Sequence, residues 1–417
     1  MQVSKGVTLG VGILFLIIVA SMLRAANLYY MAAVLVTLPA LSFAIGWHSL
    51  RGLIFEREMP SVLWAGEEAE IVYSIQNPSR FTRFFLSISE DFPESVESHE
   101  QEPTLFNVIG NESTRIAHRL TFKKRGVFQV RTFSVNAIDP LGIFTYSRVI
   151  SCDNEIIVYP KPQNLQPISL TGADRNGLQE FTISAPRGGS IEPDGVREYV
   201  PGDSLRRIHW KQTARTGRLA VLEFEEAQSI QVALFLDLQQ GIKSGQESDS
   251  CFEYAIRYAA SILEQALREG AGIRLLIPTF DEAPLAGAAA LPGRGESHFL
   301  SIMDTLARVN ATSKQSVEES ISETTNHLQS GATLIVVTSQ TSSKMSALLT
   351  NLSLIGRFRV VLIFVDPDSF TNSKLSLFNQ DRSEFFNGLL SAEVQTYILK
   401  RNAQSDVQPE VKKYVFN

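Results

Sequence analysis

Cysteine is scarce in this chain of 417 residues, which contains only Cys152 and Cys251. The two lie far apart in the sequence and do not make a disulfide framework, as expected in a reducing compartment. The six histidines are scattered, and no Cys-x-x-Cys pair is present. The common structural and catalytic zinc patterns therefore lack their ligands.

Motifs of the common enzyme classes are also missing. The small-residue stretch 287–295 lacks the Gly-Lys-Ser/Thr ending of a nucleotide phosphate loop, and no Gly-x-Ser-x-Gly or His-Glu-x-x-His motif occurs. Positive charge is in short supply too, because 38 Lys and Arg face 44 Asp and Glu, a net charge of −6. Nucleic-acid binding usually needs a basic field. We expect no cofactor, no enzymatic activity and no nucleic-acid partner.

Two long apolar runs stand at the start of the chain, at residues 7–23 and 28–47, and neither contains a charge. Each is about long enough to cross a bilayer as a helix. A signal peptide would be followed by a cleavage site and soluble sequence, whereas here a second apolar run follows at once. The pattern predicts a hairpin of two transmembrane helices within residues 1–56, with membrane lipid as a partner.

The charges around the hairpin predict its orientation. Lys5, Arg51 and Arg57 flank it on the outside, and Arg24 alone lies in the turn. The positive-inside rule then places both ends in the cytoplasm. We expect a multi-pass protein of the cell (inner, cytoplasmic) membrane whose soluble domains are cytoplasmic.

Residues 57–165 alternate apolar and polar side chains in short runs that turn signals separate at intervals of about ten residues, a pattern typical of a β-sandwich. Residues 69–75 and 116–122 are examples of such runs. His118 falls in the second run and is interpreted as an ordinary strand residue. The sequence predicts an immunoglobulin-like β-sandwich here.

Residues 230–417 alternate apolar strands with amphipathic helices. Uniformly apolar strands predict a doubly wound α/β domain whose parallel sheet is covered on both faces. The last helix is expected near residues 393–401. Asp237 ends a strand, and Gln239 and Gly241 follow where hydroxyl ligands would complete a Mg²⁺ site. Asp237 is therefore only a weak metal candidate, with a plain polar strand end as the alternative.

Residues 166–229 form a predicted connector that carries the densest polar segment of the chain, residues 197–218. A Pro-Gly-Asp turn precedes a short helix for which Asp203 or Ser204 is the predicted cap. Three interpretations remain open: a salt-bridged clasp between domains, a partner-docking surface, and a catalytic site built on Asp203 and His209. The candidate residues are Arg197, Tyr199, Gly202, Asp203, Arg206, His209, Trp210, Lys211 and Arg215.

The string from Arg197 to Arg215, with Leu219 and Glu223 after it, closely resembles the signature of the bacterial domain-of-unknown-function family 58. Residues 139–144, Asp-Pro-Leu-Gly-Ile-Phe, resemble a second segment that recurs in that family. The resemblance covers nearly the whole chain and implies a membrane hairpin, a β-rich domain, the signature block and a von Willebrand factor type A-like domain.

The resemblance also implies a partner. Members of the family are commonly encoded beside MoxR-type AAA+ ATPases, which suggests a membrane-anchored, non-enzymatic adaptor or scaffold in protein assembly or maturation. Type A domains often carry an Asp-x-Ser-x-Ser metal motif. This chain keeps Asp237 but has neither serine, which puts metal-dependent binding in doubt.

Overall fold

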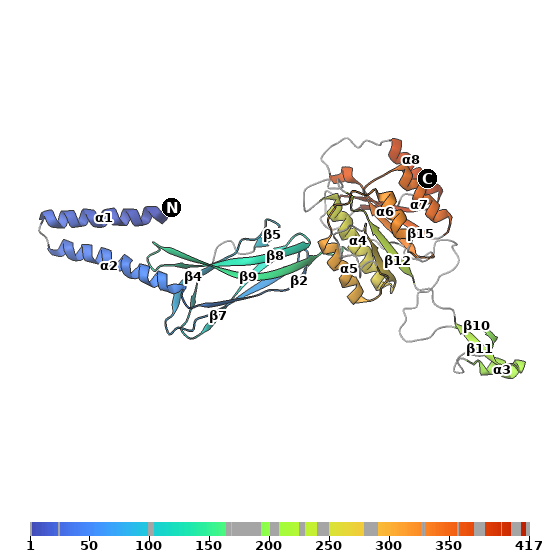
Figure 1. The fold of residues 1–417 in the computed structure, drawn as a ribbon, viewed down its shortest axis with the longest axis horizontal. Coiled ribbons are helices and arrows are strands. Elements are labelled where there is room, and N and C mark those ends of the chain that lie inside the picture. The colour runs from blue at the N-terminus through green and yellow to red at the C-terminus, as the bar shows by residue number, and fades with distance from the viewer. Residues whose placement is uncertain are drawn as a thin grey trace. The chain divides into compact units, whose positions relative to one another are not determined.

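The computed structural model describes most of the chain in two compact units (Figure 1). One unit comprises Met1–Lys161 and Met303–Val309, and the other comprises Pro162–Ile302 and Asn310–Asn417. Each is described below by itself. The described residues are 2–23, 26–98, 104–163, 168, 193–200, 208–224, 230–239, 250–278, 291–326, 328, 330–356, 358–370, 380–392, 394–401 and 410–413.

The two apolar runs form antiparallel helices in mutual contact, α1 (Gln2–Leu23) and α2 (Ala26–Ser49) (Figure 1). Within the described part of the chain, α2 alone is long and apolar enough to cross a membrane, with a mean hydropathy of 1.9. The apolar part of α1, Gly10–Leu23, is shorter. An N-terminal apolar helix of spanning length is thus present, and a second span stays a prediction.

Arg57 does not behave as the sequence predicts. Its side chain is fully buried in an ion pair with Glu90 rather than flanking the hairpin. The comparison of positive charges is then between Lys5 and Arg51 at the outer ends of the hairpin and Arg24 in its turn. The charge argument for a cytoplasmic orientation is correspondingly weaker.

Two β-sheets follow the helices. The first has the order β1-β3-β7-β5 and the second has the order β2-β9-β8-β4-β6. All their pairings are antiparallel except that of β2 with β9. The strands are β1 (Ile54–Glu58), β2 (Val62–Trp64), β3 (Glu68–Gln76), β4 (Arg83–Ser89), β5 (Val96–Ser98), β6 (Phe106–Val108), β7 (Ser113–Phe122), β8 (Gly126–Ile138) and β9 (Thr145–Tyr159).

One apolar cluster joins the two sheets, as the alternating pattern predicts for a sandwich. Ile71 and Phe122 of the first sheet and Val135 and Ile156 of the second belong to it, and each is fully buried. His118 lies on β7 with its ring 5.1 Å from that of Tyr73. It is an ordinary strand residue, as expected.

The buried ion pair between Arg57 and Glu90 joins residues that no local sequence pattern connects. The Arg57 guanidinium also donates to the carbonyl oxygens of Val130 and Cys152 and to the amide oxygen of Asn154. Glu90 accepts from the Tyr73 hydroxyl. Burial raises the pKa of Glu90 above its ordinary value, although the Tyr73 hydrogen bond and the Arg57 charge oppose that shift.

The other large sheet has the order β13-β12-β14-β15-β16-β17, with all pairs parallel except β16 with β17. The chain starts at β12, moves to β13 on one side, then crosses to β14 and onward, which is the doubly wound pattern. The strands are β12 (Gln231–Leu236), β13 (Gly272–Leu276), β14 (Thr333–Thr338), β15 (Arg359–Val365), β16 (Gln395–Lys400) and β17 (Glu410–Lys413).

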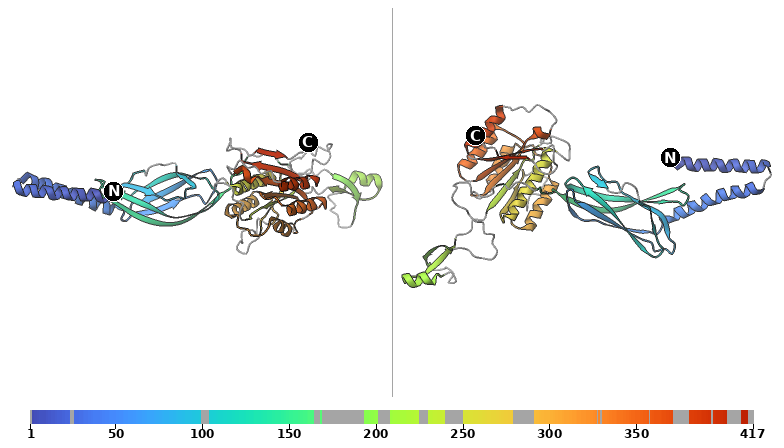
Figure 2. Two further views of the ribbon diagram at one scale, coloured as in Figure 1. Left: turned by 90° about the horizontal axis from the view of Figure 1, so that it is seen from above. Right: turned by 180° about the vertical axis from the view of Figure 1, so that it is seen from behind.

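Helices cover both faces of this sheet (Figures 1 and 2). Apolar residues of α6, α7 and α8 share one buried cluster with Phe235, Val336 and Leu362. The amphipathic helix α4 packs on the opposite face and is capped at Ser250, whose side chain accepts from Glu253 N–H. The helices are α4 (Cys251–Arg268), α5 (Glu296–Arg308), α6 (Val317–Thr325), α7 (Ser343–Leu354), the short 3₁₀ turn η5 (Pro367–Phe370) and α8 (Gln380–Ser391).

Two sequence predictions are wrong here. The helix expected near residues 393–401 is strand β16, whose central residues are buried on both faces, and the last helix is α8 instead. Within the predicted connector, residues 166–229, the structure forms strand β10 (Pro193–Glu198). Strongly buried strands lack the alternation that separates strands from short helices, which explains the first error.

Candidate functional site

The segment 197–218 is part of a small module built on a two-stranded sheet. Strand β10 pairs antiparallel with β11 (Ala220–Phe224), and Val196 faces Leu222. The pairing continues beyond β10, because Tyr199 N–H donates to the Leu219 carbonyl. The described ends of the segment are therefore held together by backbone hydrogen bonds.

A short helix, α3 (Trp210–Thr216), stands between the two strands. Its cap is His209, whose Nδ1 accepts a hydrogen bond from Gln212 N–H at 3.0 Å. Gly217, with φ of 70°, ends it in the left-handed conformation. The prediction that Asp203 or Ser204 caps this helix is wrong, since Ile208 lies in a β-bridge to Val221 and α3 begins after it.

The helix α3 has no buried residue. Trp210 is 67 % exposed, and Lys211 and Arg215 are exposed beside it. Tyr199 is half-buried. Large aromatic and cationic side chains that project from a hydrogen-bonded scaffold are the usual anchors of protein interfaces.

The described salt bridge of this segment lies within the module and does not test the predicted clasp between domains. Arg218, which the sequence did not single out, pairs with Glu198 at 2.8 Å, and both side chains are largely exposed. Such pairs contribute little to stability. The pair also raises the pKa of Arg218 through the Glu198 hydrogen bond and charge.

Several predicted residues lie outside the described part of the chain. Gly202, Asp203 and Arg206 are among them, and of Arg197 only the backbone in β10 is described. Of the two residues in the catalytic hypothesis, Asp203 and His209, the structure describes only His209. There the ring nitrogen Nδ1 is engaged as a helix cap.

The second family segment, residues 139–144, folds inward around Asp139. This carboxylate is 2 % exposed and accepts from the backbone N–H of Leu141, Ile143 and Phe144 at 3.2, 2.6 and 2.6 Å. The Ser42 hydroxyl of α2 donates to it as well. Burial alone would raise the pKa of Asp139, but these hydrogen bonds outweigh it and lower the pKa below its ordinary value.

The same loop packs against the end of α2 through aromatic rings. Phe43 contacts Phe144 and Tyr146, and the Tyr146 hydroxyl donates to the Phe43 carbonyl at 3.1 Å. Trp47 meets Tyr146 edge-on. A Cβ added at Gly46 would lie 2.4 Å from the Tyr146 ring, so glycine permits this close approach.

Asp237 lies at the carboxyl end of β12, as predicted, and is 4 % exposed. Its two carboxylate oxygens accept from Gln239 N–H at 2.9 Å and from the Thr338 hydroxyl at 2.7 Å. Burial raises the pKa of Asp237, and the nearby negative charge of Glu318 raises it further. The two hydrogen bonds lower it, but by less. No cluster of three His, Cys, Asp or Glu suited to a metal occurs among the described residues. The donors present do not fit a Mg²⁺ site, and the polar strand end is the better interpretation.

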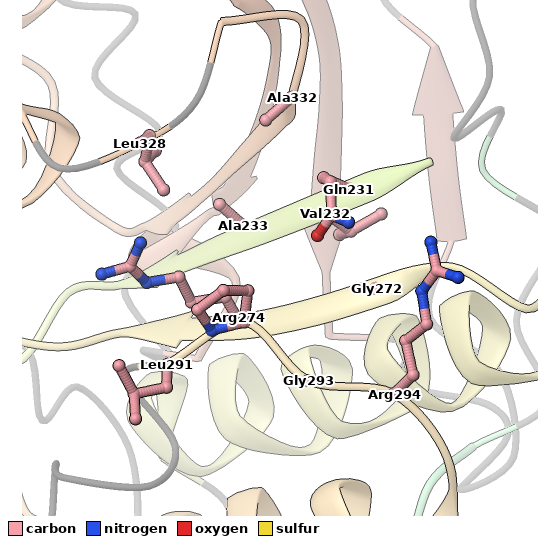
Figure 3. Close-up of a pocket in the computed structure, with 11 residues that line it drawn as sticks. Gln231, Val232, Ala233, Gly272, Arg274, Leu291, Gly293, Arg294, Leu328 and Ala332 are labelled. Carbon is pink, nitrogen blue, oxygen red and sulfur yellow. The ribbon is translucent and has the colours of Figure 1, made fainter. Parts of the chain in front are cut away.

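A cavity of about 540 Å³ lies at the opposite, amino-terminal edge of the same sheet (Figure 3). Gln231 and Gly272, the first residues of β12 and β13, line it, and Leu328 forms part of its apolar wall. Arg274 and Arg294 also line it, and Figure 3 shows their guanidinium groups well apart. They do not form a paired clamp for a single anionic group.

An apolar N-terminal helix, a β-rich unit and a doubly wound sheet with an exposed hairpin module define a multidomain protein. Residues 195–369 match the model of the family described as "Protein of unknown function DUF58". The match supports the assignment of the chain to this family, and it begins within β10, at the described start of the module.

Relatives of unknown function support the assignment. The chain is 26 % identical to the uncharacterized protein YeaD of Bacillus subtilis over 235 residues, 55 % of this chain and 56 % of that protein. It is 30 % identical to the uncharacterized protein Rv1480 of Mycobacterium tuberculosis over 128 residues, 31 % of this chain and 38 % of that one. The chain thus spans about half or less of the length of these relatives.

Similarity to solved structures is low. The alpha-2-macroglobulin fragment of Escherichia coli that runs from domain MG7 to the C-terminus matches with a TM-score of 0.23 and 14 % identity. The match covers 30 % of this chain and 21 % of that one. A score this low carries no argument about fold or function.

Proposed function

We propose that the protein is a membrane-anchored, non-enzymatic adaptor or scaffold that presents the hairpin module to a partner protein. The observation that carries the proposal is the solvent exposure of α3. The helix buries none of its residues, and it exposes Trp210, Lys211 and Arg215 from a frame that backbone hydrogen bonds hold. A segment that served only as a clasp would bury its large aromatic side chain.

The partner we propose is a MoxR-type AAA+ ATPase, acting with this protein in assembly or maturation of other proteins. The family resemblance suggests this partner. The charge of the described surface is compatible with it, because Lys211, Arg215 and Arg218 offer cations that suit an acidic protein surface around an apolar pocket for Trp210.

The anchor we propose is the hairpin of α1 and α2. The length and hydropathy of α2 support it, as does its connection to β1 through only four residues, 50–53. We further propose that both helices span the bilayer and that the two soluble units lie in the cytoplasm. Neither Asp237 nor His209 offers an observation that favours a metal-dependent or catalytic function.

Co-purification tests the partner. The full-length protein, solubilised in mild detergent, is captured with a MoxR-type ATPase encoded in the same genome. We expect Trp210→Ala and Arg215→Glu each to reduce recovery by about tenfold, the loss of a typical interface anchor. The control Lys344→Glu reverses an exposed charge on α7 and should leave recovery unchanged.

The outcome against the proposal is equally definite. Unchanged recovery with Trp210→Ala and Arg215→Glu, in proteins with native hydrogen exchange, would show that the module is not the docking surface. No recovery even for the unaltered protein would remove this class of ATPase as the partner.

A further inference from the structure

One end of the β-sandwich receives α2 and gathers several loops. The register pairs Ile54 with Gln76, Arg83 with Val108, and Ile138 with Thr145, so the loops next to these pairs share an end. Contacts of α2 with β4, β8 and β9 place the helix there too. We call this end the helix-proximal rim and define it as residues 50–54, 77–85, 109–112 and 139–146.

The loops of the rim are tied to one another. The Asn77 side-chain amide donates to the carbonyl oxygens of Phe81, Val108 and Ile109. Asn111 N–H donates to the Ser79 carbonyl at 2.9 Å. The loops 77–85 and 109–112 therefore form one connected surface.

The contacts with α2 fix the depth of the rim along the helix. Asp139 meets Ser42, and Tyr146 meets Phe43. Ser42 lies one and a half to two turns before the helix ends at Ser49, which is about 10 Å along the axis at 1.5 Å per residue. A helix needs about 20 apolar residues to cross the hydrocarbon core, and the apolar run of α2 continues to Trp47. If α2 spans, the loop 139–146 lies beside its last turns at the level of the bilayer interface.

Large apolar side chains of the rim are exposed in the way such a position requires. Phe81 is 72 % exposed, and Phe84, Phe85, Ile109 and Leu141 are between 42 and 54 % exposed. At the other end of the sandwich Val62 is 41 % exposed, and the described loops 65–67 and 123–125 contain no large apolar residue, so the rim carries the larger group of exposed apolar side chains. The asymmetry marks the rim as the end that meets an apolar phase.

The backbone at the rim favours this exposure at a cost. Phe85 has φ of 55°, and the pairing of β4 with β6 is irregular between Arg83 and Leu86. A non-glycine residue at a positive φ is strained. Bulges of this kind redirect side chains, and here both Phe84 and Phe85 are exposed with their rings 6.3 Å apart. Phe and Leu side chains of interfacial segments bury into the boundary between lipid headgroups and acyl chains.

The rim also contains a buried positive charge, that of Arg83. Its side chain is 5 % exposed, its Nε has no hydrogen-bond partner, and its one hydrogen bond runs to the Arg51 carbonyl at 3.3 Å. A buried guanidinium is normally paired with an anion. Arg51 itself lies 4.7 Å above the Trp47 ring. Two arginines without a carboxylate thus lie where the helix leaves its apolar run.

We propose that the helix-proximal rim is a bilayer-contacting surface, which rests on the proposed membrane anchor. Phe81, Phe84, Phe85, Ile109 and Leu141 enter the interface around α2, and Arg83 with Arg51 binds the phosphate of an anionic lipid headgroup. Contact of the rim with lipid then holds the sandwich in one orientation relative to the bilayer, instead of leaving it connected to the membrane only through α2.

Spin labels on the full-length protein in lipid nanodiscs test the proposal. Single cysteines replace Phe84, Leu141, Val62 at the other end of the sandwich, and Leu41 in α2, in a Cys152→Ser background. Cys251 is buried and should not react. We expect labels at 84, 141 and 41 to be reached by oxygen and shielded from a water-soluble nickel chelate, and the label at 62 to show the reverse.

The four labels separate the two proposals. Labels at 84 and 141 that are open to nickel, while the label at 41 is in lipid, would overturn the rim and leave the anchor standing. A label at 41 that is open to nickel would overturn the anchor and the rim with it. A lipid signal at 62 as well would indicate unspecific adsorption and also contradict the proposal.

The headgroup contact needs a second comparison. Nanodiscs of phosphatidylcholine alone are compared with nanodiscs that also contain phosphatidylglycerol. We expect the anionic lipid to lower nickel access at the label on 84 severalfold, Arg83→Gln to abolish that change, and Arg83→Lys to retain it. Arg131→Gln, which removes an exposed arginine near the other end, is the control. A lipid effect that survives Arg83→Gln, or no effect at all, would overturn the headgroup assignment.

Discussion

The two segments that resemble the family, residues 139–144 and 197–218, use their polar residues in opposite ways. In the first, Asp139 is buried and accepts four hydrogen bonds, including one from the Ser42 hydroxyl. In the second, the described helix α3 buries nothing and exposes Trp210. One segment builds the fold, and the other leaves its large aromatic side chain exposed.

The same contrast holds for the ion pairs of the two regions. Arg57 and Glu90 are almost fully buried, whereas Arg218 and Glu198 are 76 and 70 % exposed. A buried charge depends on its partner, and an exposed one exchanges its partner for water. Charge density in the sequence therefore does not indicate which charges stabilise the protein.

The largest effect is expected at the buried pair. Arg57→Met leaves the Glu90 carboxylate buried without its cation, although the Tyr73 hydroxyl still donates to it, and breaking a buried pair costs about 3–5 kcal/mol. We expect that loss in the free energy of unfolding, measured by urea-dependent hydrogen exchange of β8 and β9. Arg218→Met is the control for an exposed pair and should have little effect, so losses of equal size would contradict the contrast.

The next largest effect is expected at Asp139. Asp139→Ala leaves the backbone N–H groups of Leu141, Ile143 and Phe144 without their acceptor, and unsatisfied buried donors cost about 1–3 kcal/mol each. We expect a loss of about 3 kcal/mol in the sandwich, since part of the loop can reach water. Hydrogen exchange should rise in residues 139–146 and at the end of α2.

Two substitutions make this prediction specific. Asp153→Ala removes a carboxylate that is 85 % exposed and should leave exchange unchanged. Trp210→Ala, in the exposed segment 197–218, should also leave the free energy of unfolding of the sandwich unchanged. A loss of stability with Trp210→Ala as large as that with Asp139→Ala would show that both segments are structural.

Much of the fold could be predicted because its signals are local. The alternation around Ile71 and Leu120 identifies sandwich strands, and Ser250 before an amphipathic run marks the start of α4. The strand at residues 395–400 was mistaken for a helix because both of its faces are buried. Periodicity cannot distinguish such a run from a short buried helix.

The candidate site could be predicted only in part because its contacts are distant in sequence. Asp139 meets Ser42 across 97 residues, and Arg57 meets Glu90 across 33. No spacing rule joins residues so far apart. Strand β10 was missed for the same reason, since its partner β11 begins 22 residues after β10 ends. The cap at His209 was missed because histidine is not among the residues that usually cap helices.

The pH dependence should differ in sign between two buried carboxyls. Asp139 has a lowered pKa in the fold, so its stabilisation is full above its ordinary value of 3.8 and is lost as pH falls through the folded value. Glu90 has a raised pKa, so its ionisation destabilises the fold above its ordinary value of 4.5, and that penalty is relieved as pH falls.

Urea midpoints of the sandwich as a function of pH test this pair of signs. Asp139→Asn should flatten the loss of stability below about pH 4, near the ordinary aspartate pKa. Glu90→Gln should flatten the loss that accompanies rising pH above about 4.5. Parallel pH profiles for both variants would contradict the assignment of opposite shifts.

The smallest effect is expected at the cap of α3. His209→Ala removes the acceptor for Gln212 N–H, and loss of a helix cap costs about 0.5–2 kcal/mol. Because α3 buries no residue, the change should open the helix locally without unfolding the rest of the protein. Hydrogen exchange of residues 210–217 should increase several-fold, while the exchange of β12 and β14 stays unchanged. His209→Asn supplies a strong alternative cap and should restore protection, and equal exchange in the two variants would show that the ring stabilises α3 through some contact other than the cap.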